Sequence, residues 1–377
     1  MISKLKWMNM YRTGIKYNKV IFVINSVQNQ RCIKRINEFL THGYSIYAYG
    51  FKRDTTYHTK PENFNIEILE EFSNKKNYVS RILIYFKNIK NLQNKYKNDD
   101  VLYYYFGLDI SMVGSLLSKK PYIYEESDLS HTYIRCSLTK WILERIDRYI
   151  IRHSYRTVLT SEGFYTYHFG NYYKNKPDNI FIIPNRLNIN ILNFKYDGRR
   201  TPTINNLRFA FVGGARFQSV FNFVKVFAKN FPEHEFHFYG NPMINADKYF
   251  ELGRKFSNIH FHGPFKNPIE LPKIYHSIDL VLSTYDAFYD NVRFLEPNKL
   301  YEALYFEVPI IVSKNTYLAE KVKRLNVGFE INALDDEEII LFIKTLSVQM
   351  LNEKSQACAK IDKNELINVN TEFFSKL

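Results

Sequence analysis

The sequence predicts an α/β protein made of two doubly wound halves, each a parallel sheet covered by helices. Short apolar runs alternate with segments of helical periodicity along most of the 377 residues, a pattern typical of parallel sheets. This length favours two domains over a single core. Residues 185–203 interrupt the alternation with Asn, Asp, Gly, Arg and Pro, and we expect the linker there.

The first half contains seven candidate strands and is expected to form a domain over residues 1–195. The strands are expected at Lys19–Ile24, Tyr44–Tyr49, Phe64–Leu69, Val101–Phe106, Pro121–Glu125, Arg156–Thr160 and Ile180–Ile183. Helices are expected at Arg31–Leu40, Tyr78–Asn98, Ile110–Leu117 and Leu138–Ser154.

The second half repeats the alternation and is expected to form a domain over residues 204–352. Its strands are expected at Leu207–Val212, Glu235–Tyr239, Asn258–His262, Asp279–Thr284, Val308–Ser313 and Gly328–Ile331. Its helices are expected at Phe217–Asn230, Pro268–Ser277, Asn298–Phe306, Leu318–Leu325 and Asp335–Gln349. Residues 353–377 are expected to form a helical tail that packs back on the first domain. Two such halves would place a ligand cleft at the carboxyl ends of both sheets.

The positive charge of the chain is concentrated in its first half. Residues 1–200 hold 32 Lys and Arg against 17 Asp and Glu, whereas residues 201–377 hold 20 against 21. This indicates a polyanionic partner for the first half, such as an anionic lipid, a phosphorylated acceptor or a nucleic acid; a general solubility charge is the alternative. A nucleic acid is the least favoured partner, because no recognition module is present.

The segment Tyr78–Asn98 suggests what that partner is. Apolar residues recur at helical spacing in it, with lysines and arginines alongside. A basic helix of this kind is typical of binding to a membrane surface. The alternative is a helix that packs on its own sheet and leaves its lysines in solvent.

Cysteine content and hydropathy bear on the compartment. Cys32, Cys136 and Cys358 are far apart and have no metal-ligand spacing, which favours a reducing compartment and no disulfide framework. No apolar run approaches the roughly 18 residues of a membrane-spanning helix, and the basic N-terminal stretch has none long enough for a signal peptide. We expect a cytoplasmic protein, associated peripherally with the inner face of the cell membrane, that uses no cofactor.

The strongest chemical signal is a strand, a polar loop and a helix that begins near Pro297 and Asn298. Proline suits the first helical position and asparagine suits a cap, and the free N–H groups of such a helix can bind a diphosphate. Lys299 and Glu302 share one face of this helix, where a carboxylate can accept hydrogen bonds from ribose hydroxyls. The alternative is an amphipathic helix with a surface ion pair.

A second polar group follows a strand of the first half. Glu125, Glu126 and Asp128 lie where that strand should end, and a carboxylate there can orient an acceptor hydroxyl or take its proton. Alternatively, one of them only caps the next helix. The loop that begins at Asn25, with Arg31, should face the same edge of the sheet.

These segments resemble those of GT-B glycosyltransferases in the large retaining family 4. Members of that family often read Pro-Asn-Lys-Leu-Phe-Glu before a strand, and here Pro297, Asn298, Lys299, Leu300 and Glu302 match, followed by Val308–Ser313. Weaker likenesses occur in the family's order at Val20–Arg35, Tyr122–Leu129, Leu143–Ser161 and Ile182–Asn185.

The resemblance implies two Rossmann-like domains facing across a cleft and a nucleotide-sugar site in the second. Glu302 would bind the ribose, and Asn298 and Lys299 would lie against the diphosphate or its sugar. Gly213 and Gly214 would form a turn that approaches the phosphates, or else a tight turn without ligand. Further residues would complete the donor site: Arg216 at the leaving diphosphate, Gly240 near the base and Tyr285 as a pocket wall.

On the acceptor side, Glu125 and Asp128 would be catalytic, with Asn25, Arg31 and Glu126 beside them. Two family residues are absent, because Phe294 and Phe221 stand where an acid and a lysine are usual. Glu296 is two residues too close to Glu302 to replace the missing acid.

The function expected from this resemblance is transfer of a hexosyl-type sugar, with retention and without a metal. The acceptor would be a cell-surface polysaccharide or a polyprenyl-diphosphate-linked oligosaccharide, as in capsule or lipopolysaccharide biosynthesis. Two alternatives remain: a non-catalytic partner subunit, and a nucleotide-sugar epimerase or hydrolase of the same fold. Sugar, nucleotide, acceptor, linkage and oligomeric state do not follow from the sequence.

Overall fold

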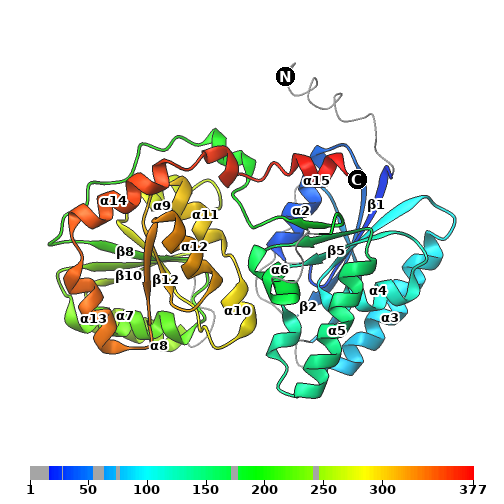
Figure 1. The fold of residues 1–377 in the computed structure, drawn as a ribbon, viewed down its shortest axis with the longest axis horizontal. Coiled ribbons are helices and arrows are strands. Elements are labelled where there is room, and N and C mark those ends of the chain that lie inside the picture. Colours follow the sequence, from blue (N-terminus) through cyan, green and yellow to red (C-terminus); the bar gives the residue numbers. More distant parts are fainter. Residues whose placement is uncertain (1–16, 28, 54–62, 74–76, 171–176, 241–245) are drawn as a thin grey trace. The chain divides into compact units, whose positions relative to one another are not determined.

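The computed structural model describes residues 17–377 except 28, 54–62, 74–76, 171–176 and 241–245. The chain forms two compact units (Figure 1): unit 1 is Met1–Pro184 with Asn370–Leu377, and unit 2 is Asn185–Val369. Each unit contains one parallel sheet with helices on both faces, so the predicted α/β class with two Rossmann-like domains is confirmed.

The sheet of unit 1 has seven parallel strands in the order β3-β2-β1-β4-β5-β6-β7. They are β1 (Lys19–Ile24), β2 (Ser45–Arg53), β3 (Ile66–Phe72), β4 (Val101–Phe106), β5 (Tyr122–Glu126), β6 (Arg156–Leu159) and β7 (Ile180–Ile182). β3 lies at an edge of this sheet and carries Glu67, Glu70 and Glu71. Strands β1 and β4 are buried along their whole length apart from Lys19, as expected for the centre of a parallel sheet.

Helices cover both faces of this sheet. They are α2 (Gln30–Thr41), α3 (Tyr78–Lys95), α4 (Leu108–Leu117), α5 (Ser137–His153), α6 (Glu162–Phe169) and α15 (Thr371–Ser375), with a 3₁₀ turn at Ser130–Tyr133. Phe22 and its same-face neighbours pack with residues of α2 and α15, such as Phe39 and Phe373. The alternate residues, such as Ile21 and Val23, pack with α3, α4 and α5, which lie side by side in Figure 1.

The sheet of unit 2 has six parallel strands in the order β10-β9-β8-β11-β12-β13. They are β8 (Arg208–Val212), β9 (Glu235–Tyr239), β10 (Ile259–Gly263), β11 (Leu280–Ser283), β12 (Ile310–Ser313) and β13 (Gly328–Ile331). Its helices are α7 (Gln218–Asn230), α8 (Ala246–Lys255), α9 (Leu271–His276), α10 (Asp290–Phe294), α11 (Asn298–Tyr305), α12 (Tyr317–Leu325), α13 (Asp336–Thr345) and α14 (Val348–Ala359), with 3₁₀ turns at Ile189–Asn193 and Lys363–Leu366.

Three details of unit 2 differ from the sequence expectation. Helices α8 and α10 were not predicted from the sequence, since α10 is only five residues long and α8 is mostly polar. The helix expected at Asp335–Gln349 is broken near Ser347, whose side chain accepts from Met350 N and so begins α14. The units divide after Pro184 rather than at residue 195, because Leu187 and Ile191 are buried in the core of unit 2.

Candidate functional site

The loops that follow β8 and β9 pack directly against each other at the carboxyl edge of the sheet in unit 2. Gly213 N donates to Tyr239 O over 2.7 Å, and Gly240 N donates to Gly263 O over 2.7 Å. Both Gly213 and Gly240 have positive φ, 121° and 106°. A Cβ on Gly240 would lie 2.5 Å from Gly213 O, so this contact between the two loops requires glycine.

The ammonium group of Lys299 lies over the turn at Gly213. Lys299 Nζ is 4.3 Å from the centre of the Phe211 ring, 3.5 Å from Tyr285 Oη and 3.5 Å from where a Cβ of Gly213 would stand. A cation is therefore held beside a turn that carries no side chain of its own at Gly213. Gly213, Gly240, Tyr285 and Lys299, all predicted donor-site residues, come together here.

Two helices begin near this edge, and they differ at their N-termini. Asp286 follows β11 and accepts hydrogen bonds from Gln218 N and Ser219 N at the start of α7. No side chain of the described residues caps the start of α11, which begins after Pro297. The dipole of α7 thus already faces a carboxylate, whereas the N-terminus of α11, beside Lys299, is open to an anion.

Glu302 lies one turn along α11 and is held by a residue that the sequence did not indicate. Glu302 is 6% exposed, and its Oε2 accepts a 2.8 Å hydrogen bond from Tyr275 Oη of α9. Burial, together with the neighbouring charge of Glu302, raises the pKa of Tyr275 well above its ordinary value. Tyr275 therefore stays protonated and orients the Glu302 carboxylate. No sequence signal links these two residues.

Glu296 has a different environment. Its carboxylate is buried and accepts from Lys321 Nζ at 2.7 Å and from the hydroxyl of Tyr301. This buried ion pair joins the segment before α11 to α12.

The remaining predicted donor residues border this group. Gly214 is half-buried in the turn, and Asn298 is exposed in the first turn of α11. Arg216 is exposed, with its guanidinium 5.2 Å from the Phe217 ring. Of the cations near this edge, Lys299 is the one placed against the glycine turn.

In unit 1, the loops after β1, β4 and β5 meet at the carboxyl edge of the sheet. Asn25 Nδ2 is 3.3 Å from where a Cβ of Gly107 would stand. Arg31 Nη1 donates to Ser127 O over 2.6 Å and lies 3.5 Å from Asp128 Oδ2. The side chains of Arg31 and Asp128 are 31% and 53% exposed, so a guanidinium and a carboxylate remain accessible there.

Glu125 and Glu126 differ from the prediction that both face an acceptor. Both are fully buried. Glu125 forms an ion pair with Arg35, 2.9 Å from Oε2 to Nε, and accepts from the hydroxyl of Tyr104. Glu126 lies 2.9 Å from His168 Nε2. Consecutive residues of a strand point to opposite faces of the sheet, and helices cover both faces here. The contacts of Glu125 are therefore those of a structural residue.

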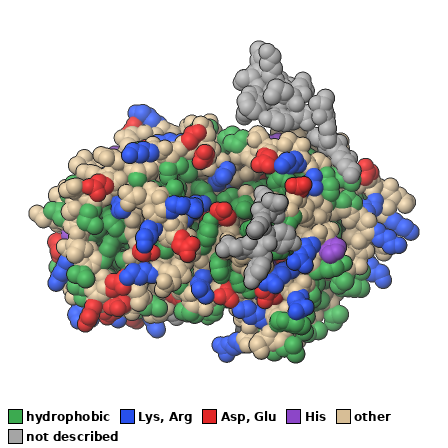
Figure 2. All heavy atoms as spheres, in the orientation of Figure 1, with side chains coloured by type: hydrophobic (Ala, Val, Ile, Leu, Met, Phe, Trp, Pro, Cys, Tyr) green, Lys and Arg blue, Asp and Glu red, His purple; other side chains and the backbone are tan. Residues whose placement is uncertain are grey.

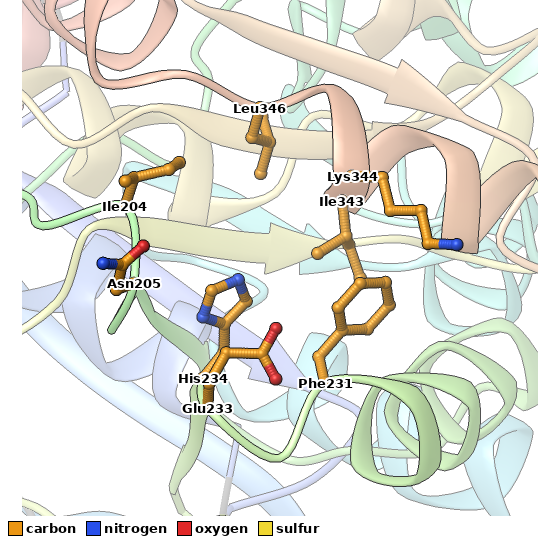
Figure 3. A pocket seen from close by; sticks show the side chains of 8 residues that line it. All are labelled: Ile204, Asn205, Phe231, Glu233, His234, Ile343, Lys344 and Leu346. Carbon is orange, nitrogen blue, oxygen red and sulfur yellow. The ribbon is translucent and has the colours of Figure 1, made fainter.

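A depression of about 340 Å³ lies elsewhere in unit 2 (Figure 3). It is lined by Ile204, Asn205, Phe231, Glu233, His234, Ile343, Lys344 and Leu346. The segments at 204–205 and 233–234 precede β8 and β9. The depression is therefore at the amino edge of the sheet, away from the glycine turn.

Comparison with solved structures shows which known proteins share this architecture. The chain is similar to sucrose-phosphate synthase from Thermosynechococcus elongatus, with 14% identity, a TM-score of 0.65, and 95% of this chain and 96% of that chain covered. It is similar to HepE from Anabaena in complex with UDP and glucose, with 17% identity, a TM-score of 0.64, and coverage of 95% and 99%. WaaG, a glycosyltransferase involved in lipopolysaccharide biosynthesis, matches with 14% identity, a TM-score of 0.59, and coverage of 92% and 97%.

The chain has the GT-B fold. The GT-B fold is not confined to transferases, since a putative UDP-N-acetylglucosamine 2-epimerase from Listeria monocytogenes also matches, with 13% identity, a TM-score of 0.55, and coverage of 90% and 91%. No protein-family model matches the sequence, and no curated protein does either. In this GT-B chain, none of the described helices is long and apolar enough to span a bilayer.

Proposed function

We propose that this GT-B protein is a glycosyltransferase that takes a nucleotide-sugar donor in unit 2. The observation that carries the proposal is the position of Lys299, whose ammonium lies against the Gly213 turn beside the open N-terminus of α11. A diphosphate binds well where backbone N–H groups, a helix dipole and a cation all point to one place.

In this proposal the diphosphate is the leaving group, and the protein stabilises the charge that develops on it. Lys299 supplies the cation that the family usually places five residues after Arg216, where this chain has Phe221. Phe221 packs edge-on against Tyr249 at 5.2 Å, so it belongs to the core. With Lys299 and Arg216 at the diphosphate we expect no metal requirement for the transfer step, and added Mg²⁺ should not raise turnover.

Glu302 binds the ribose hydroxyls in this scheme, and Tyr275 sets the angle of its carboxylate. On the acceptor side, Asp128 orients the acceptor hydroxyl, because Glu125 and Glu126 are buried. Arg31 then contacts a phosphate of the acceptor. The resemblance to retaining family 4 supports transfer with retention to a cell-surface glycan or to a polyprenyl-diphosphate-linked acceptor.

We further propose that unit 1 docks on an anionic membrane. Val79, Leu83 and Phe86 of α3 are exposed, at 68%, 65% and 43%, beside lysines of the same helix. Because a helix that follows a parallel strand begins at the carboxyl edge of the sheet, the exposed ends of α3 and α5 lie at the same edge as Asp128. Figure 2 shows hydrophobic side chains among Lys and Arg where α3 and α5 lie.

Helix α5 adds to this surface. Leu138, Trp141 and Ile142 are exposed in its first two turns, and the guanidinium of Arg145 lies 4.0 Å from the Trp141 ring. A depression of about 430 Å³ on this helix is lined by Trp141, Glu144, Arg145, Arg148, Tyr149, Arg152 and His153. Tryptophan and arginine together are typical of surfaces that contact the lipid headgroup region.

Nucleotide binding tests the donor site. UDP, GDP, ADP and CDP would be titrated by calorimetry against the wild type, Lys299→Ala and Glu302→Gln. Loss of one charge-assisted hydrogen bond should weaken binding about 10- to 100-fold. Lys344→Ala and Glu233→Gln, at the opposite edge of the sheet, are matched controls and should bind normally. Equal affinity in Lys299→Ala and the wild type would refute the site.

Product analysis separates the three candidate functions. Incubation with a nucleotide-sugar and a polyprenyl-diphosphate-linked acceptor should yield an elongated acceptor and a nucleoside diphosphate. An altered sugar still attached to its nucleotide would indicate an epimerase, and free sugar without acceptor a hydrolase. Nucleotide binding without turnover, together with stimulation of a second transferase, would indicate a partner subunit.

Sedimentation with vesicles tests the membrane surface. The wild type should bind vesicles containing phosphatidylglycerol and not phosphatidylcholine alone. Trp141→Ala and Leu83→Asp should reduce binding, whereas Phe250→Ala and Leu334→Ala, exposed apolar residues of unit 2, should not. Unchanged binding of a combined Trp141→Ala, Leu83→Asp variant would mean that another surface contacts the lipid.

A further inference from the structure

A cluster of buried titratable side chains lies in unit 1 beneath the end of β5. Glu126, Asp147, His131 and His168 are each at most 4% exposed. They come from β5, α5, the 3₁₀ turn at Ser130–Tyr133, and α6, which all lie in one unit. None of them has a part in the proposed transfer reaction.

Three of these side chains converge on one point. His168 Nε2 lies 3.0 and 2.9 Å from the two carboxylate oxygens of Glu126. An oxygen of Asp147 completes a set of three ligand atoms that are all within 4.8 Å of one another. Metal ions bind imidazole nitrogen and carboxylate oxygen at about 2.0–2.2 Å, so ligand atoms this close together can share one ion.

The polar atoms of this cluster are not all satisfied. Asp147 Oδ1 accepts from Tyr124 Oη at 2.9 Å. Asp147 Oδ2 is buried without a hydrogen bond, and so is His131 Nδ1, at 3.4 Å from it. A buried, unsatisfied carboxylate oxygen is costly and calls for a partner.

The charge of the cluster is also unbalanced. Among the described residues, no lysine or arginine forms an ion pair with Glu126 or Asp147, whereas the buried carboxylates of Glu125 and Glu296 do have such partners, Arg35 and Lys321. Two carboxylates without a cation in a dry interior are strongly unfavourable, and a divalent ion would neutralise both.

We propose that Glu126, Asp147 and His168 bind one divalent transition-metal ion of the Zn²⁺ or Mn²⁺ class, as a structural site within unit 1. One imidazole and two carboxylates suit these ions, whereas Mg²⁺ and Ca²⁺ prefer oxygen alone. Tyr124 holds Asp147 in place from outside the ligand set. The ion ties β5 to α5 and α6.

The rival interpretation needs no ion. Without an ion, burial and the charge of Asp147 raise the pKa of Glu126 well above its ordinary value. The rival to a metal is therefore a proton shared between Glu126 and Asp147.

Metal content and stability distinguish the two. The full chain, purified without chelator or affinity metal, should contain about one equivalent of Zn²⁺ or Mn²⁺ by plasma mass spectrometry. Glu126→Gln and His168→Gln should contain less than a tenth of that. Glutamine mimics a protonated carboxyl group, so Glu126→Gln should keep the wild-type melting temperature if Glu126 and Asp147 share a proton. If they bind a metal, the melting temperature of Glu126→Gln should fall by about 5 °C or more.

A second group of possible ligands provides the control. Glu235, His237 and His260 also lie within ligand distance of one another, but Glu235 already pairs with Arg208 at 2.9 Å. His260→Ala should therefore leave the metal content unchanged. Loss of metal in His260→Ala, with retention in Glu126→Gln and His168→Gln, would overturn the proposal.

One measurement needs no variant and so does not depend on whether a variant folds. Wild-type protein stripped with a chelator and refilled with Co²⁺ should develop visible d–d absorption at one equivalent and should regain its melting temperature. Metal-free wild type that neither takes up Co²⁺ nor gains stability from Zn²⁺ or Mn²⁺ would refute the site and assign the shared proton.

Discussion

Tyr275 Oη donates to Glu302 Oε2 over 2.8 Å, and this buried contact joins α9 to the helix that begins at the candidate diphosphate site. Tyr275→Phe should leave the carboxylate in place but less well oriented. We expect a loss of about 1 kcal/mol in stability and a roughly fivefold weaker affinity for the nucleotide.

Calorimetry and urea denaturation of Tyr275→Phe measure both effects. Unchanged affinity combined with reduced stability would mean that Tyr275 supports only the packing of α9. Tyr249→Phe is the matched control, because Tyr249 is another buried tyrosine of unit 2 and its hydroxyl donates to Phe217 O at 3.4 Å.

Gly240→Ala should damage the glycine turn directly. Its Cβ would lie 2.5 Å from Gly213 O, in addition to the strain of a positive φ. Gly263→Ala has the same kind of strain, with φ 74°, but nothing within 4 Å of the added carbon. We expect a loss of about 1 kcal/mol for Gly263→Ala and about 3 kcal/mol for Gly240→Ala. Equal losses in denaturant titrations would show that the two loops move apart at little cost.

Lys321→Met should destabilise unit 2 by about 3 kcal/mol, because it removes the ammonium group that pairs with the buried Glu296 carboxylate at 2.7 Å. Glu296→Gln in the Lys321→Met background should restore most of the stability. A double-mutant cycle by urea denaturation measures the coupling between the two side chains. Coupling below about 0.5 kcal/mol would contradict the ion pair.

Acid should weaken unit 2 through His237. Burial, and then the charge of His260, lowers the pKa of His237 to about 4 in the folded protein, against 6.5 as its ordinary value. Below pH 6.5 the unfolded chain therefore takes up a proton that the folded chain does not, so stability falls with pH until about 4. Between pH 6.5 and 5 the loss should be about 2 kcal/mol.

Stability curves of the wild type and His237→Gln at several pH values test this. The variant should lose less stability on acidification than the wild type. Equal slopes would mean that Glu235, His260 and His262, the other titratable groups in contact with His237, compensate for it.

The sequence predicted the parallel sheets well, because their strands are buried on both faces and appear as apolar runs. β1, β4, β9 and β13 match the expected bounds throughout. Short or polar elements such as α10 and α8 could not be found this way. The start of α11 was predicted from Pro297 and Asn298, because the sequence signal for a helix start lies in neighbouring residues.

The candidate site was predictable where neighbours in sequence are neighbours in space. The turn at Gly213 and the face with Lys299 and Glu302 are of this kind. Tyr275, Asp286 and Lys321 act on residues far from them in the chain, so only the fold reveals them. Burial of Glu125 and Glu126 was missed for the same reason, since α2 and α6 supply Arg35 and His168.

Strand β3 has a consequence for the solution behaviour of unit 1. An open strand edge is a template for pairing with another molecule, and β3 also exposes Ile68. Two of its three glutamates pair with lysines of the same unit, Glu71 with Lys52 and Glu67 with Lys95. We expect these charged groups to keep the edge hydrated and to oppose pairing with a second molecule, so replacing them with uncharged residues should promote self-association.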